Sequence, residues 1–392
     1  MLADGGNSVG DLDGLLQCPV TRTRLIRAAS DQLRAINEAI LRRELSHGDG
    51  SRVSVPLEAA YISEDGSHAY GVKDGIALLL PALAVVLSSN IPPSSLATPF
   101  AAEKQLVKDF YDQVGWKTID GVFVDSLKFA DRRPVVREYF QKIHQRARRH
   151  LNPTGRFILD GASGPIPHPE QSVYSEGFDY RICLDFSFDA LRAARMKLGA
   201  KGIYILGDLT KLPLADDSLD AVISLHTLYH VPADEQKNAL QEIYRVLKPG
   251  ARAVVVYSWG SHSVLMRLAS QDHRINRAII KALAFLKGLR KKGMLDQSSE
   301  RPPDPPVNLY FYVHPYSWFM RVLGTLGPFK LACWRSASVE FQRAYIHDWL
   351  YGRQILAIIF WFEDKFPWLF GRLGQYPMFV IRKPSIRHEG VH

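Results

Sequence analysis

Residues 156–185 read RFILDGASGPIPHPEQSVYSEGFDYRICLD, and this stretch decides the fold. It begins and ends with a short apolar run that finishes on an aspartate. Runs of this kind are typical of buried parallel strands, and five occur in order: 156–160, 180–185, 202–208, 220–226 and 251–259. Helical patterns at 189–198 and 234–247 lie between some of them. The alternation predicts an α/β protein whose parallel sheet is covered by helices on both faces.

The composition is that of a globular protein. Of 392 residues, 46% are hydrophobic and 23% are charged, which excludes collagen-like, fibrous and largely disordered chains. Three cysteines, Cys18, Cys183 and Cys333, lie too far apart in the sequence for a disulfide scaffold or a four-cysteine zinc site. We expect them to be core residues, and we expect no disulfide-linked partner.

Neither a membrane span nor a secretory signal is expected. The apolar runs 76–87 and 355–362 are shorter than the roughly 20 residues that a spanning helix needs. Residues 1–14, MLADGGNSVGDLDG, lack the basic head and apolar core of a signal peptide. With so few cysteines, the sequence predicts a cytoplasmic protein in a reducing compartment.

Composition shifts divide the chain into segments. Residues 1–87 are expected to form an N-terminal accessory module, and the Pro- and Ser-rich residues 88–100 a linker. Residues 101–385 are expected to form the α/β domain, with helical insertions at 261–325 and 340–373.

The net charge of +9 is concentrated in one predicted helix. Residues 262–293 contain eight Lys or Arg and one acid, Asp272, with apolar residues between them. The simplest interpretation is an amphipathic helix that covers the sheet and exposes a basic face. The alternatives are contact with RNA phosphates or peripheral binding to an anionic membrane.

Three acids stand at the carboxyl ends of consecutive predicted strands: Asp160, Asp185 and Asp208. Ligands of doubly wound sheets bind at this edge. Asp160 precedes the small-residue turn GASGP, which lets a ligand approach the backbone. Asp185 suits a ribose diol and Asp208 an adenine amine. The alternative is helix capping and turn formation in another α/β protein. A nicotinamide-binding domain would carry GxGxxG, which is absent here.

Residues 156–250 resemble the class I S-adenosylmethionine-dependent methyltransferases, with a domain similar to methyltransferase type 11. The matching segments are ILDGASG, CLDFSFDALRAAR, GDLTKLPLADDSLDAVISLHTLYHV and EIYRVLKPG. The resemblance implies S-adenosylmethionine as cofactor and a Rossmann-like, seven-stranded sheet. Its last two strands would form an antiparallel edge, and residues 329–339 and 376–384 fit those places.

The resemblance also implies which residues hold the cofactor. They are Asp160, Ala162 and Gly164 at the methionine part, Asp185 at the ribose, Phe186, Asp208 and Leu209 at the adenine, and Ser224 beside the methyl group. The family's loop carries three glycines at alternate positions, and here only Gly164 matches, since the other two positions are Ala162 and Ile166. The stretch 165–181 is longer than usual. We expect it to fold over the site and to contact the substrate through His168, Glu170 or Tyr174.

Candidate catalytic residues follow the fourth predicted strand. His226 is the residue we expect nearest the acceptor, where a base could take a proton. The alternative is a structural histidine, and positioning alone can supply much of the rate. Tyr229 and His230 are further substrate candidates. Residues 110–117, FYDQVGWK, resemble the lead-in segment of small-molecule methyltransferases, in which Tyr111 and Trp116 would close over the cofactor.

The N-terminal module resembles, more weakly, the zinc-ribbon modules that accompany some RNA methyltransferases. The matching features are LLQCP near its start and VKDGIALLLP at its end. Such a module would bind zinc through four cysteines, whereas Cys18 is the single cysteine of residues 1–87. A metal-free version is therefore expected.

The tail at 346–371 is rich in aromatic residues, including Trp349, Trp361 and Trp368. It is expected to pack on the substrate side and to build an apolar pocket. The alternative is recognition of a lipid-linked substrate at a membrane surface.

Together these features predict a methyltransferase that acts at oxygen or nitrogen of a small organic acceptor. An RNA methyltransferase is the second hypothesis, supported by the N-terminal resemblance and the basic helix. A non-catalytic, cofactor-binding scaffold is the third, because Pro165 and Ile166 depart from the family's loop.

Overall fold

The computed structural model describes residues 14–88, 102–270 and 309–385. The predicted linker lies outside them except for Ser88. So does most of the predicted basic helix, of which α8 (Val264–Ser270) is described. None of the described helices is long and apolar enough to cross a membrane.

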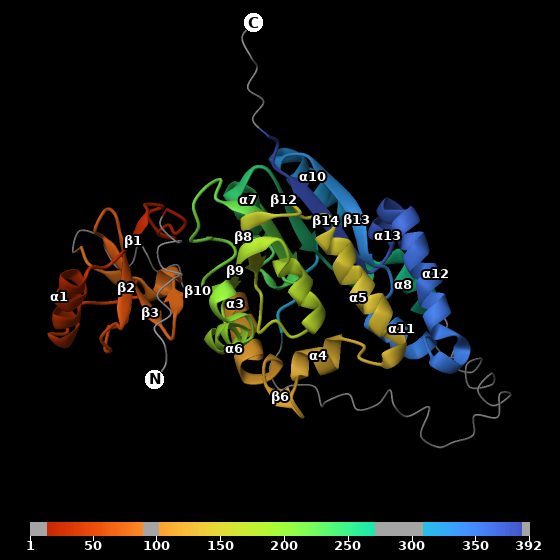
Figure 1. The fold of residues 1–392 in the computed structure, drawn as a ribbon, viewed down its shortest axis with the longest axis horizontal. Coiled ribbons are helices and arrows are strands. Elements are labelled where there is room, and N and C mark those ends of the chain that lie inside the picture. Colours follow the sequence, from red (N-terminus) through yellow and green to blue (C-terminus); the bar gives the residue numbers. More distant parts are fainter. Residues whose placement is uncertain (1–13, 89–101, 271–308, 386–392) are drawn as a thin grey trace, which may run out of the picture.

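One mixed sheet runs through the described chain in the order β1-β2-β3-β4-β10-β9-β8-β11-β12-β14-β13 (Figure 1). The strands of its central part are β8 (Gly155–Gly161), β9 (Phe178–Asp185), β10 (Gly202–Leu206), β11 (Leu219–Leu225) and β12 (Leu247–Val256). They pair in parallel, as predicted. Strand β14 (Tyr376–Arg382) lies between β12 and β13 (Phe329–Arg335), antiparallel to both. The expected antiparallel edge is therefore confirmed.

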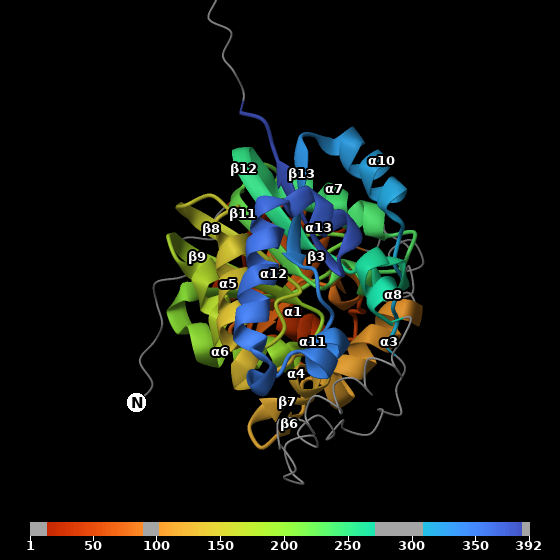
Figure 2. The same ribbon diagram turned by 90° about the vertical axis from the view of Figure 1, so that its right-hand side faces the viewer.

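Helices cover both faces of the sheet (Figures 1 and 2). On one face, apolar side chains of the strands pack against α5 (Pro134–Arg148), α6 (Phe188–Leu198) and α12 (Gly352–Lys365). On the other face they pack against α7 (Gln236–Val246) and α10 (Tyr316–Leu326). The result is the three-layer, Rossmann-like arrangement that the strand–helix alternation predicts. Cys183 and Cys333 are buried in these layers, as expected.

The N-terminal residues continue the same sheet. Helix α1 (Ser30–Leu41) and strands β1 (Leu25–Arg27), β2 (Ala59–Ser63) and β3 (His68–Lys73) precede β4 (Ile76–Leu78). Strand β4 pairs in parallel with β10, so the module is joined to the core by main-chain hydrogen bonds. The short strand β5 (Val85–Val86) pairs with β3.

Cys18 is buried in this module, with its sulfur 3.2 Å from the hydroxyl of Tyr70. In the described parts of the chain, no three His, Cys, Asp or Glu side chains cluster in a way that could hold a metal ion. The likeness to a zinc ribbon stays a prediction.

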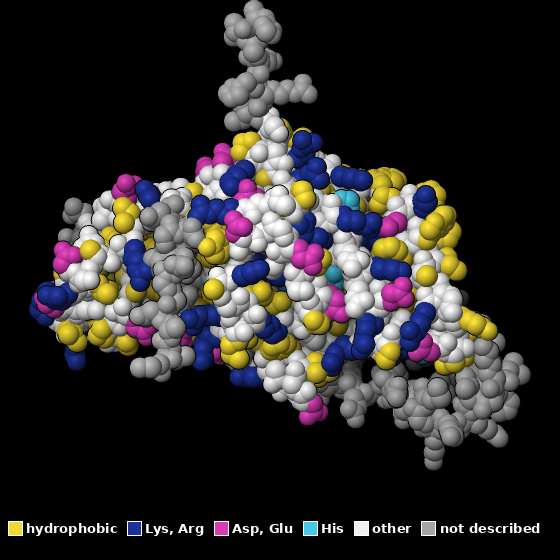
Figure 3. Space-filling model, viewed as in Figure 1, with side chains coloured by type: hydrophobic (Ala, Val, Ile, Leu, Met, Phe, Trp, Pro, Cys, Tyr) yellow, Lys and Arg dark blue, Asp and Glu magenta, His cyan; other side chains and the backbone are white. Residues whose placement is uncertain are grey.

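The prediction for the aromatic tail was wrong. No residue of 346–371 lines the cavity described below. Helix α12 packs on the sheet with one side, while Trp361 and, in α13 (Pro367–Leu373), Trp368 are about half exposed, at 52% and 53%. Hydrophobic side chains gather along this edge in Figure 3. Apolar periodicity indicates an amphipathic helix, but it does not tell which neighbour the apolar side meets.

Candidate functional site

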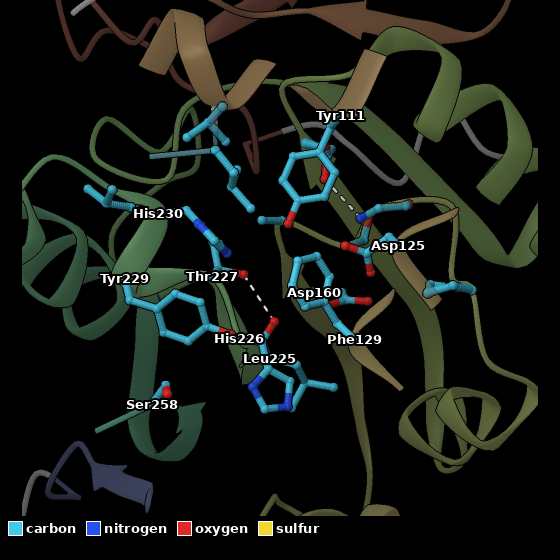
Figure 4. Close-up of a pocket in the computed structure, with 18 of the residues that line it drawn as sticks. Tyr111, Asp125, Phe129, Asp160, Leu225, His226, Thr227, Tyr229, His230 and Ser258 are labelled. Carbon is cyan, nitrogen blue, oxygen red and sulfur yellow. Dashed lines mark hydrogen bonds between the residues drawn. The ribbon is translucent and has the colours of Figure 1, made fainter. Parts of the chain in front are cut away.

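A cavity of about 550 Å³ lies at the carboxyl ends of the central strands. This is the edge at which ligands of open α/β sheets bind. Figure 4 shows Tyr111, Asp125 and Phe129 on one side of it and Tyr229 and His230 on the other. A cavity of this size with aromatic walls and a few polar groups is typical of a small-molecule site.

Most of the predicted site residues line this cavity: Asp160, Ala162, Gly164, Asp185, Phe186, Asp208, Leu209, His226, Tyr111, Trp116, His168, Tyr229 and His230. Two do not. The hydroxyl of Ser224 donates to the carbonyl of Gly161 at 3.1 Å. Tyr174 is fully buried behind the wall, with its hydroxyl 2.9 Å from Nδ1 of His144. The structure thus gathers the residues, while their roles stay predictions.

The loop after β8 keeps a glycine-like backbone although two of the family's three glycines are replaced. Ala162, Gly164 and Ile166 have φ of 59°, 55° and 51°. This left-handed conformation is unfavourable for alanine and more so for the β-branched isoleucine. Two contacts hold it: Nζ of Lys197 donates to the carbonyls of Pro165 and Ile166, at 2.8 and 2.6 Å, and the Ile166 side chain is buried. The departures in sequence therefore do not abolish the turn.

Asp185 is fixed beside that turn. Its Oδ2 accepts from the backbone N–H of Gly164 at 2.8 Å, and its Oδ1 accepts from that of Ser187 at 2.9 Å. Each carboxylate oxygen has a further lone pair for a ligand hydroxyl. Burial raises the pKa of Asp185 to about 6, although the two N–H groups oppose this shift.

Asp160 is held by a buried arginine. Nη2 and Nε of Arg181 lie 2.5 and 3.2 Å from its Oδ2. Arg181 stands on the neighbouring strand β9, and its side chain is 1% exposed. The ion pair compensates both charges inside the protein.

Asp208 has a partner that the sequence did not indicate. Nζ of Lys104, on α3 (Ala102–Phe110), lies 2.7 Å from its Oδ2 and 2.5 Å from Oε2 of Glu235. Oδ1 of Asp208 accepts from the backbone N–H of Thr210 at 2.8 Å. An adenine amine would share this carboxylate with Lys104.

Two aromatic rings lie over the loop. Tyr111 begins a π-helical turn, Tyr111–Gly115, and its ring stacks on Trp116 with centroids 4.7 Å apart. The Trp116 ring lies so close to Gly164 that a Cβ there would meet it at 2.8 Å. Such π-helical turns often occur at functional sites.

His226 lies in the cavity wall after β11, with φ of 60°. Its Nδ1 is buried without a hydrogen-bond partner in the described residues. Burial, and after it the charge of Arg335, lowers the pKa of His226 to about 3. The imidazole is therefore neutral and only weakly basic, which argues against a strong base at this position. Nδ1 of His230 donates to the carbonyl of Tyr310 at 2.8 Å, and burial lowers its pKa to about 4.

Asp125 and Arg335 are among the charged residues of the cavity wall that the sequence reasoning missed. Asp125 stands on the short helix α4 (Val124–Phe129), outside any motif. Burial raises its pKa to about 7, with Lys128 opposing the shift. Arg335 ends β13, and only the apolar run 329–339 marked that strand in the sequence.

Residues 171–255 match the family model described as a methyltransferase domain. A demethylmenaquinone methyltransferase of Renibacterium salmoninarum is 39% identical over 101 residues, or 26% of this chain and 40% of that protein. Methyltransferase GfsG of Streptomyces halstedii is 25% identical over 175 residues, or 42% of this chain and 62% of that protein. The chain thus spans less than two thirds of the length of either relative.

Solved structures are similar at low scores. Phosphoethanolamine N-methyltransferase 2 of Haemonchus contortus, in complex with phosphomonomethylethanolamine and S-adenosylhomocysteine, is 13% identical with a TM-score of 0.39, over 77% of this chain and 62% of that one. A methyltransferase in complex with the Haloferax volcanii Trm112 activator is 14% identical with a TM-score of 0.37, over 64% of this chain and 92% of that one.

Proposed function

We propose that this chain, whose central domain is of the class I S-adenosylmethionine-dependent methyltransferase family, transfers a methyl group to a small organic acceptor. One observation carries the proposal. Asp160 and Asp185 on two neighbouring strands, Gly164 in the loop after β8 and Asp208 just after β10 all line a single cavity.

The residues present fit the cofactor that the family implies. Asp185 is a buried carboxylate with free lone pairs, and it stands beside a turn whose Gly164 leaves no room for a Cβ beneath Trp116. The ribose hydroxyls of the cofactor can donate hydrogen bonds to such a carboxylate. A turn of small residues leaves its backbone accessible to the methionine part of the cofactor. When bound, S-adenosylmethionine would supply a methyl group on a positively charged sulfur, which a nucleophile can attack directly.

The remaining work falls to this chain's side chains. Tyr111 and Trp116 cover the cofactor end and exclude water. Tyr229, Phe311 and Tyr376 offer aromatic faces at the other end, where an acceptor ring could pack. Asp125, with its pKa of about 7, can accept a proton from the acceptor near neutral pH.

The names of the curated relatives include quinone C-methyltransferases, so carbon joins oxygen and nitrogen as the atom methylated in this proposal. A cavity with aromatic walls suits a phenol or quinol ring, whichever of these atoms receives the methyl group. Methyl transfer from the labelled cofactor into a cell extract, followed by mass spectrometry, would identify the product.

Calorimetry with S-adenosylhomocysteine tests the cofactor site. We expect micromolar binding by the wild-type protein and loss of binding in Asp185→Ala. Asp189→Ala is the matched control, because Asp189 lies on the adjacent helix α6 and its side chain is 70% exposed. If the wild-type protein does not bind S-adenosylhomocysteine, the proposed function fails.

A further inference from the structure

One buried cation of the described residues has no carboxylate partner. Lys104, Arg146, Arg181 and Arg335 are all at least nine-tenths buried. The first three lie within 3.0 Å of a carboxylate oxygen. No carboxylate of the described chain lies within ion-pairing distance of Arg335, and its Nε is buried without a hydrogen-bond partner.

Such a group is costly to the folded protein. An uncompensated charge removed from water destabilises the folded state. Arg335 is 6% exposed and stacks on the ring of Tyr376, with the guanidinium carbon 4.6 Å from the ring centroid. This contact supports the cation, but it leaves Nε of the guanidinium without an acceptor among the described residues.

The position of Arg335 assigns it to the acceptor rather than to the cofactor. The aspartates of the cofactor end stand on β8 and β9 and just after β10. Arg335 stands on β13, beyond β11, β12 and β14 in the sheet. Its neighbours in the cavity wall are Trp334, Tyr376 and the neutral His226, whose ring centroid is 5.1 Å from that of Tyr376.

We propose that Arg335 binds an anionic group, a carboxylate or a phosphate ester, on an aromatic methyl acceptor. The planar guanidinium pairs with two oxygens of such a group, and the surrounding rings pack against the aromatic body. The inference rests on the proposed function, since it names the acceptor class for the same cavity.

Ligand titrations by NMR test the inference with three probes: 4-hydroxybenzoate, phenyl phosphate and the neutral 4-hydroxybenzamide. We expect at least one anion to bind the wild-type protein about tenfold more tightly than the amide, as a charged hydrogen bond allows. The anion that binds more tightly than the amide shows whether the group on the acceptor is a carboxylate or a phosphate ester. In Arg335→Gln this preference should disappear, and in Arg335→Lys it should persist in weaker form. Arg321→Gln, an exposed arginine of α10 outside the cavity wall, is the control.

Two results would overturn the inference. One is equal binding of all three probes by the wild-type protein. The other is a loss of S-adenosylhomocysteine affinity in Arg335→Gln that equals the loss of affinity for the anionic probe. Arg335 would then hold the carboxylate of the cofactor. Should Arg335→Gln not fold, a wild-type crystal soaked with 4-hydroxybenzoate decides between a carboxylate on Arg335, which supports the inference, and one elsewhere in the cavity, which overturns it. The probe titrations are carried out both with and without S-adenosylhomocysteine. A failure of the cofactor site is thereby distinguished from a failure of the anion site at Arg335.

Discussion

Nζ of Lys104 lies 2.7 Å from Oδ2 of Asp208, and this ion pair joins the lead-in helix α3 to the end of strand β10. Both side chains are more than nine-tenths buried. The same ammonium also neutralises Glu235, 2.5 Å away. A single cation thus compensates two acids beside the cavity and fixes the helix that directly precedes Tyr111.

Replacement of Lys104 should destabilise the protein strongly. In Lys104→Met, Asp208 and Glu235 become neighbouring acids without a cation, which costs about 3–5 kcal/mol. Thermal unfolding should report a lower midpoint. Lys142→Met is the control, because Lys142 forms an exposed pair with Glu138 on α5 and should change stability by less than about 1 kcal/mol. Equal midpoints for both variants would contradict this account.

Gly164 should be required for its shape as well as for its backbone angle. Gly164 and Gly199 share φ of 55°, but an added Cβ meets Trp116 at 2.8 Å only at Gly164 and meets nothing within 4 Å at Gly199. Both alanine variants should lose at least about 1 kcal/mol of stability through the backbone, because φ is positive at both positions. Only Gly164→Ala should also lose affinity for S-adenosylhomocysteine, by about tenfold or more, the effect of 1.4 kcal/mol. Calorimetry on both variants checks this, and similar affinities would show that the contact with Trp116 is unimportant.

Cofactor binding should weaken in acid. Burial raises the pKa of Asp185 to about 6, so the carboxylate is ionised above this pH and protonated below it. Only the ionised form accepts hydrogen bonds from both ribose hydroxyls. The affinity for S-adenosylhomocysteine should therefore be constant above about pH 7 and fall as the pH drops through 6. Asp185→Asn should bind weakly with no such dependence, and a wild-type affinity that is flat from pH 5 to 8 would refute the role of this carboxylate.

The sheet and the cofactor end were predictable because both depend on local patterns. Each strand of the core is an apolar run, and parallel strands necessarily bring Asp160, Asp185 and Asp208 to one edge. The turn at 162–166 was less predictable, since its unusual angles at Ala162 and Ile166 are held by Lys197, a residue of the following helix.

At both ends of the cavity, contacts between residues distant in the sequence were not revealed by the sequence. Arg335 meets Tyr376, 41 positions later, and Lys104 meets Asp208, 104 positions later. No spacing rule connects such pairs. The exposed Trp361 and Trp368 show the converse, because an aromatic run suggests a pocket in the sequence but lies at the surface in the fold.

Asp125, rather than His226, should control the pH dependence of methyl transfer. A base works best when its pKa lies near the working pH. Burial raises the pKa of Asp125 to about 7, whereas burial and Arg335 lower that of His226 to about 3. The turnover rate with the identified acceptor should rise through pH 7 as Asp125 ionises. Asp125→Asn should lower the rate about a hundredfold and abolish this rise.

His226→Gln is the matched variant, since it changes another residue of the cavity wall without removing a group that titrates near neutral pH. Its rate should keep the rise through pH 7, because the imidazole is already neutral over the whole range. Measurements of kcat between pH 5.5 and 8.5 on the two variants separate the candidates. A rise that survives in Asp125→Asn and disappears in His226→Gln would assign the base to the histidine. If the rise survives in both, a titrating group other than these two, such as the acceptor itself, produces it.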